Sequence, residues 1–431
     1  MMGRPSASRF LAGADVAPAL SGMIGKVALT AAFAFAWANA RGIPAQGFVT
    51  ENVRLELFVA AVFTLACCVA TKRPVSPPGT LAPLIPLVPA MAADGVHPLV
   101  LALLTGGLGL LLARSSLIER IAGKGGVSVK AGMLMLLGLL GIRDVLGTLW
   151  RWSKVPHPTG NGVMELNGFP VWLLLLGTGL AIWLLLRWTR RDNWVIPSLG
   201  VMALLISWLL GRMPEVTAAP GWPVIDPMGW WQGRWGAVMP LGWRLVFSAL
   251  PYALLVLVLW PMDAMAIRTL QTQCDEERGT RTAIDLRASF VVISLRNLIG
   301  ALLGGAQTAA VWRSFLIPLA RTGRPVQGAA LLLALGVLGV ALLGFPIDLV
   351  VHPPLVGLVL LFGVFMPLVE TGVRMFRRAC TGGALLPVGA VLPVGAVLTI
   401  GLVIGPIWGW GAGLLAEWLW TRHSAGKSAT G

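Results

Sequence analysis

Long apolar runs separated by short charged loops follow one another along this chain. Examples are "PVWLLLLGTGLAIWLLL" from Pro170 and "GAALLLALGVLGVALLGF" from Gly328. A helix that crosses a bilayer needs about 20 apolar residues, and these runs approach that length. The pattern predicts about fourteen spans, near residues 20–40, 55–71, 78–93, 98–116, 127–147, 169–187, 194–211, 245–267, 286–303, 307–320, 327–345, 354–373, 383–399 and 400–420.

Composition supports this interpretation. The 431 residues are 56% hydrophobic and only 12% charged, and the mean hydropathy is +0.80. A soluble globular domain does not have such values. We therefore expect an all-α polytopic membrane protein that has the lipid bilayer as its surroundings.

The net charge of +15 does not indicate a nucleic-acid partner, because the basic residues are spread over alternate loops instead of forming one patch. By the positive-inside rule, the basic loops are cytoplasmic and both termini lie inside. The opposite side carries the Trp-rich stretch from Met228 to Trp243. We expect this stretch to lie among the outer headgroups.

A short motif occurs twice. "LIPL" stands at Leu84–Leu87 and again at Leu316–Leu319, and "GMLMLLGLLG" from Gly132 is matched by "GLVLLFGVFM" from Gly357. The mates lie roughly 230 residues apart in the same order, as two homologous halves would place them. Since seven spans separate each pair, the second half is expected upside down. Such inverted repeats are typical of secondary transporters.

The two LIPL segments form the third and tenth spans, and both are short and broken. "PVSPPGTLAPL" precedes the first and "LGGAQTAAVW" the second. Proline and glycine at this density predict an extended stretch followed by a half helix, tolerated at membrane depth where the backbone lines a cavity. Two half-helix N-termini that face each other would favour an anionic or carbonyl-rich solute.

The expected domain organisation follows from the repeat. It comprises a cytoplasmic tail, a first inverted repeat of seven spans, an extracytoplasmic Trp-rich connector, a second inverted repeat and a second cytoplasmic tail, at residues 1–16, 17–211, 212–244, 245–420 and 421–431.

With these features in place, the sequence resembles the superfamily of sulfate permeases (SulP) and nucleobase-ascorbate (xanthine/uracil) permeases. More closely, "IGKVALTAAFAFAWA", "ENVRLELFVAA", "GTLAPLIPLVPAMAADGVHPL" and "LLGFPIDLVV" resemble a functionally uncharacterised family of bacterial permeases. The resemblance implies a core domain and a gate domain, substrate held between spans three, eight and ten, a homodimer and a bacterial inner membrane. Sulfate permeases usually end in a cytoplasmic STAS domain, whereas this sequence stops at Gly431, as nucleobase permeases without that domain do.

Four candidate binding residues precede the half helices. They are Thr80 and Leu81 before the first, and Gln307 and Thr308 before the second. The side-chain oxygens of Thr80, Gln307 and Thr308 can cap a helix or contact a ligand, and the residues alone do not distinguish the two roles.

Two charged residues complete the candidate site. Asp263 follows Pro261 in span eight, where a carboxylate is costly and needs a partner; it matches the acidic residue that the resemblance implicates in substrate binding or proton coupling. Pairing with Arg268 near the inner interface is the structural alternative. Arg313 resembles the arginine that faces the anion in sulfate permeases, and a salt bridge to Asp263 is its alternative role.

Other polar residues at depth are Arg296, Asn297, Lys130 and Glu370, for which we expect helix–helix pairing. Glu370 is a second coupling candidate. The sequence has no legible metal site, Walker A loop or catalytic motif, so we expect a non-enzyme with no cofactor beyond a coupling proton or sodium ion.

The sequence thus predicts a secondary-active transporter for a small anionic or weakly acidic solute, working by alternating access of core and gate. The alternatives are a nucleobase–proton symporter and a passive anion channel on the same fold.

Overall fold

The computed structural model describes residues 11–71, 73–115, 127–154, 165–166, 169–235, 242–305, 307–381 and 388–428. These ranges are nearly all helical, apart from one short antiparallel pair, β1 (Glu165–Leu166) with β2 (Phe169–Pro170). Within them, seven helices are long and apolar enough to cross a membrane, and four shorter apolar helices accompany these. The chain is a multi-pass membrane protein.

One bundle combines helices from the two halves of the chain. Its members are α1 (Val16–Arg41), α2 (Ala45–Phe63) with its π-helical continuation η2 (Thr64–Ala70), η3 (Ala82–Leu87) with α3 (Val88–Ala93), α4 (Pro98–Arg114), α10 (Trp243–Arg278), α11 (Leu286–Leu302), α12 (Arg313–Ala320) and α13 (Val326–Leu343).

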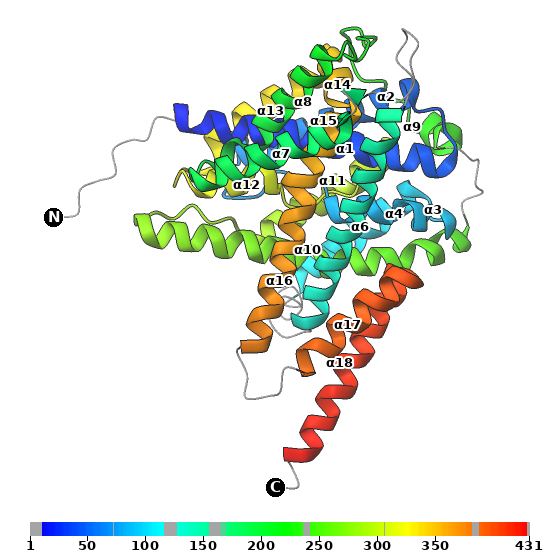
Figure 1. Ribbon diagram of the computed structural model, residues 1–431, viewed down its shortest axis with the longest axis vertical. Helices are drawn as coiled ribbons and strands as arrows, with labels where there is room; N and C mark the ends of the chain where they lie inside the picture. The colour runs from blue at the N-terminus through cyan, green and yellow to red at the C-terminus, as the bar shows by residue number, and fades with distance from the viewer. Residues whose placement is uncertain are drawn as a thin grey trace, which may run out of the picture.

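A second bundle packs against the first along α1 and η3. It contains α6 (Val127–Lys154), α7 (Val171–Trp188), α8 (Val195–Leu209), α15 (Pro353–Leu360) with the π-helical η6 (Leu361–Phe365) and α16 (Met366–Thr381), α17 (Val388–Val403) and α18 (Pro406–Ser428). Figure 1 shows α17 and α18 side by side at the C-terminal end of the molecule. Short connecting elements are η1 (Gly13–Asp15), η4 (Asp192–Trp194), α9 (Pro227–Gly229), η5 (Trp230–Arg234) and α14 (Phe345–Val350).

The predicted fold class is confirmed, including the broken third and tenth spans. Residues 73–81 run without helix into η3, and residues 307–312 run without helix into α12. The two extended segments lie antiparallel: the Gly79 N–H donates to the Ala310 carbonyl at 2.7 Å and the Leu81 N–H to the Thr308 carbonyl at 2.9 Å. This short ladder satisfies backbone groups that no helix serves.

The Trp-rich stretch differs from expectation. Trp230 and Trp235 are buried in the protein instead of lying among headgroups. Both pack edge-on against Phe48, and the Trp235 indole N–H donates to the Gly304 carbonyl at 3.1 Å. The indole N–H groups of Trp235 and Trp231 find acceptors just after and within the last turn of α11, at the Gly304 and Ala301 carbonyls. The Trp230 indole N–H is buried without a hydrogen-bond partner in the described structure, so aromatic packing alone accounts for its burial. Residues 236–241 lie outside the described part of the chain.

Gly79 permits the closest approach of the two extended segments. A Cβ atom at this position would lie 2.6 Å from the Trp312 Cα, a backbone atom that cannot move aside alone. We expect Gly79→Ala to destabilise the protein by about 1–3 kcal/mol through overpacking, measured as a lowered melting temperature in detergent. Gly107→Ala in α4 is the control, because a Cβ there meets no atom within 4 Å; equal effects of the two substitutions would contradict the crossing geometry.

Candidate functional site

Buried side chains from α2 and α11 hold the second extended segment. The Gln307 N–H donates to Glu56 Oε1 at 2.8 Å, and Arg296 Nη1 donates to the Gln307 carbonyl at 2.5 Å. Glu56 and Arg296 also form an ion pair with each other, with both side chains fully buried. Asn297 Oδ1 accepts from the Ala309 N–H at 2.7 Å. Side chains thus replace the neighbouring strand that an extended segment ordinarily requires.

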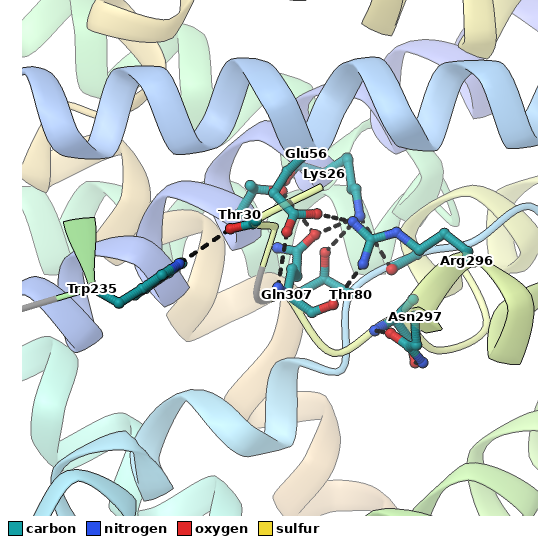
Figure 2. Close-up of polar contacts among 11 residues, drawn as sticks. Lys26, Thr30, Glu56, Thr80, Trp235, Arg296, Asn297 and Gln307 are labelled. Atoms are coloured by element: carbon teal, nitrogen blue, oxygen red, sulfur yellow. Dashed lines mark hydrogen bonds and ion pairs between the residues drawn. The ribbon is translucent and has the colours of Figure 1, made fainter. Parts of the chain in front are cut away.

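Lys26 of α1 reaches the point where the two segments cross. Its Nζ donates to the Gly79 carbonyl at 3.1 Å, to Thr80 Oγ1 at 3.1 Å and to Gln307 Oε1 at 2.7 Å. Figure 2 shows these groups beside the Glu56–Arg296 pair. Lys26 is only 1% exposed, and among the residues that the structure describes it forms no ion pair with a carboxylate.

A cavity of about 30 Å³ lies between the two bundles at this crossing, which is room for about two water molecules. The first bundle contributes Lys26, Thr80, Asp263, Trp312, Arg313 and Ser314, among others, and the second contributes Ile196, Val359, Gly363, Val364 and Leu368. Gly363 belongs to η6, and π-helical turns within α-helices are frequent at functional sites.

The charges around the cavity do not cancel. Arg313 Nη1 lies 2.8 Å from Asp263 Oδ1, so α12 and α10 contribute a neutral pair. Glu56 and Arg296 form another neutral pair. The ammonium of Lys26 is therefore the excess charge of this constellation, and in a site shielded from water its field is strong.

Hydroxyl groups add hydrogen-bond donors. Thr80 Oγ1 accepts from Lys26, so its own proton is directed away from Lys26. Ser314 Oγ lines the cavity and is buried without a hydrogen-bond partner in the described structure. Together with Lys26 and Arg313, these groups are suited to an acceptor-rich solute.

The predicted residues divide into those at the cavity and those beside it. Thr80, Asp263 and Arg313 line it. Gln307 faces Lys26, whereas Thr308 and Leu81 are buried and contribute backbone groups to the ladder. Neither half helix has a side-chain cap, so the capping alternative for Thr80, Gln307 and Thr308 is wrong. The reason is that these side chains precede the actual N-cap residues, which are Leu81 and Trp312.

The acidic candidates have partners. Asp263 pairs with Arg313, as one alternative predicted, and Arg268 is exposed farther along α10. Glu370 in α16 accepts from Arg187 of α7, with distances of 2.5 and 3.0 Å, and does not belong to the cavity lining.

Two charged residues of the site were not singled out from the sequence. Lys26 and Glu56 both stand inside apolar spans, in the quoted segments "IGKVALTAAFAFAWA" and "ENVRLELFVAA". An ionisable residue at such depth is by default a functional candidate, so this signal was present for Lys26 in particular.

A larger hollow of about 770 Å³ opens farther along α1. Its lining includes Ala32, Asn39, Asp144 and Arg151, and Ala32 is about one helical turn from Leu29 of the central cavity. Toward the other end of α1, Arg321 after α12 pairs with Asp192 of η4 at 2.6 Å and links the two bundles.

Comparison with solved structures reveals the same fold. SLC26A9 matches with a TM-score of 0.60 at 16% identity over 94% of this chain, which spans 65% of that protein. The murine Solute Carrier 26 family member A9 anion transporter in the inward-facing state gives 0.60 at 15% identity, covering 98% of this chain and 69% of that one. The transmembrane domain of the cyanobacterium bicarbonate transporter BicA gives 0.52 at 16% identity, covering 94% and 98%.

The similarity confirms the sulfate-permease type of fold and, at these identities, the fold alone. A search of curated protein sequences found no match. The model of the family described as "Protein of unknown function (DUF3360)" matches residues 4–415. The chain therefore belongs to the DUF3360 family.

Proposed function

We propose that this protein is a secondary-active transporter for a small anion, with its binding site at the central cavity. One observation carries the proposal: the uncompensated ammonium of Lys26 lies beside Arg313 and two hydroxyl groups in a cavity between two bundles. The structural neighbours support it, because their names describe an anion transporter and a bicarbonate transporter.

Alternating access is the mechanism that the arrangement supports. The cavity is lined by residues of both bundles, so movement of one bundle against the other would change access to it. The larger hollow provides an approach along the C-terminal half of α1, while the Asp192–Arg321 pair links the bundles at the other end. With a cytoplasmic N-terminus, this corresponds to a state that opens outward.

The remaining features of the proposal follow from the sequence. We place the protein in a bacterial inner membrane with both termini cytoplasmic, as a homodimer. Asp263 is the favoured coupling residue, since it contacts Arg313 at the cavity, whereas Glu370 pairs away from it. A nucleobase is the alternative substrate; the cavity of about 30 Å³ favours a smaller solute unless the bundles separate.

Removing the central charge should weaken anion binding. We expect Lys26→Gln to raise the dissociation constant about ten- to hundredfold, or about 1.4–2.8 kcal/mol, because it removes the excess positive charge beside the cavity. The measurement is thermal stabilisation of the purified protein by chloride, bicarbonate, nitrate, sulfate, dicarboxylates and nucleobases. Lys130→Gln is the matched control, a buried lysine of α6 outside the cavity lining. An equal loss in both variants, or no stabilising anion for the wild type, would refute the proposed site.

The Arg313–Asp263 pair makes a separate prediction. Arg313→Ala leaves the Asp263 carboxylate facing the cavity and removes the excess positive charge, so anion affinity should fall. The double variant Arg313→Ala/Asp263→Asn restores the charge balance and should bind more tightly than Arg313→Ala alone. If the double variant is as weak as the single one, Arg313 acts by direct contact and not by balancing Asp263.

Transporter and channel predict different fluxes. In proteoliposomes with imposed proton or sodium gradients, a secondary-active transporter should accumulate the stabilising anion beyond its electrochemical equilibrium. Asp263→Asn should reduce that accumulation if Asp263 carries the coupling. Uptake that stops at equilibrium under both gradients would instead identify a passive anion channel.

A further inference from the structure

The ammonium of Lys26 lies in a cage of neutral oxygens. Its three acceptors are a backbone carbonyl at Gly79, a hydroxyl at Thr80 and an amide oxygen at Gln307, all within 3.1 Å. The Trp312 ring adds a fourth side, with its centroid 5.4 Å from Nζ. Figure 2 shows the lysine and the side chains of Thr80 and Gln307 converging at this point.

The three contacts match the three protons of an ammonium group. A lysine –NH₃⁺ has three donors and no acceptor, and each of the three oxygens accepts from Nζ. A neutral amine has only two N–H donors for the three oxygens, so the Thr80 hydroxyl would have to donate to its lone pair. The geometry therefore fits a charged lysine, which is 1% exposed and separated from bulk water.

The cage would remain if the lysine were removed. Gly79 and Thr80 are fixed by the ladder, and the backbone of Gln307 is held by Glu56 and Arg296. Carbonyl and hydroxyl oxygens that converge on unwound backbone in a membrane protein are the ligands of small monovalent cations. An aromatic face also attracts cations.

We propose that this cage is a monovalent-cation site that Lys26 fills permanently. The tethered ammonium joins the two extended segments through their oxygens and supplies the positive charge that a bound sodium or potassium ion would otherwise bring. The wild type consequently has no sodium or potassium requirement at this site. The cation site is inferred from the geometry of the cage alone. Its effect on solute binding rests on the proposed anion transport.

The test uses purified full-length wild type and Lys26→Ala, with sodium, potassium, ammonium or methylammonium gluconate titrated against choline gluconate at constant ionic strength. The melting temperature of the wild type should not respond to the choice of cation. Lys26→Ala should melt lower and regain stability saturably, by about 2–5 °C for a cation well above its dissociation constant. Methylammonium, the closest mimic of the lost group, is expected to be effective.

Two control variants make the result specific. Lys130→Ala removes a buried lysine of α6 and should show no cation-dependent recovery. Lys26→Ala/Gln307→Leu removes one cage oxygen and should lose most of the recovery seen with Lys26→Ala. Recovery of equal size in Lys130→Ala would indicate a general salt effect, and recovery of equal size in the double variant would show that the Gln307 oxygen does not hold the cation. Either result would overturn the proposal.

Two further outcomes would overturn the proposal. The first is a wild type that sodium or potassium stabilises more than choline does, with methylammonium competing against that ion. The lysine would then not fill the cage, or the cation would bind at another site. If Lys26→Ala folds but no cation restores it, the lysine is only a structural donor. A failure of the proposed anion transport would look different. No anion in the panel would stabilise the wild type, while cations would still restore the stability of Lys26→Ala.

Discussion

The need to satisfy backbone polar groups away from water governs the centre of this protein. Two segments give up helical hydrogen bonds inside a membrane protein, where each unpaired N–H or C=O costs several kcal/mol. They meet this need by pairing with each other through Gly79 and Leu81, and by recruiting Glu56, Arg296 and Asn297 as side-chain substitutes for strands. Glu56 and Arg296 therefore have a structural role, the satisfaction of backbone groups, that does not depend on any role in transport.

The same arrangement determines the charge of the site. Once Glu56 is committed to Arg296 and Asp263 to Arg313, no carboxylate among the described residues pairs with Lys26. Neutral oxygens surround its ammonium and leave its charge in excess. The proposed attraction for an anion therefore arises from the same network that satisfies the backbone, and Thr80 takes part in both.

The cavity lies where the two bundles meet, so in the proposed mechanism a movement of one bundle changes access to the binding site. Its floor is the rigid crossing of the extended segments, whereas its opposite wall is formed by α8 and by α15, η6 and α16. The floor is fixed by hydrogen bonds within one bundle, while the wall contacts it mainly through apolar side chains. Apolar surfaces slide past each other more readily than hydrogen-bonded ones separate, so the proposed alternating access places its motion at the bundle interface.

The sequence by itself determined the spans, the inverted halves and the broken third and tenth spans, because hydropathy, proline and glycine act locally along the chain. It also identified Thr80, Asp263 and Arg313, which the structure brings to one cavity. Only the tertiary structure decided the partners. Asp263 pairs with Arg313 and not with Arg268, two alternatives that the sequence left open, and Glu56 pairs with Arg296 across 240 positions of sequence. Tryptophans are buried where an exposed belt was expected. Which donor meets which acceptor depends on the packing of distant helices, and local sequence carries no record of that packing.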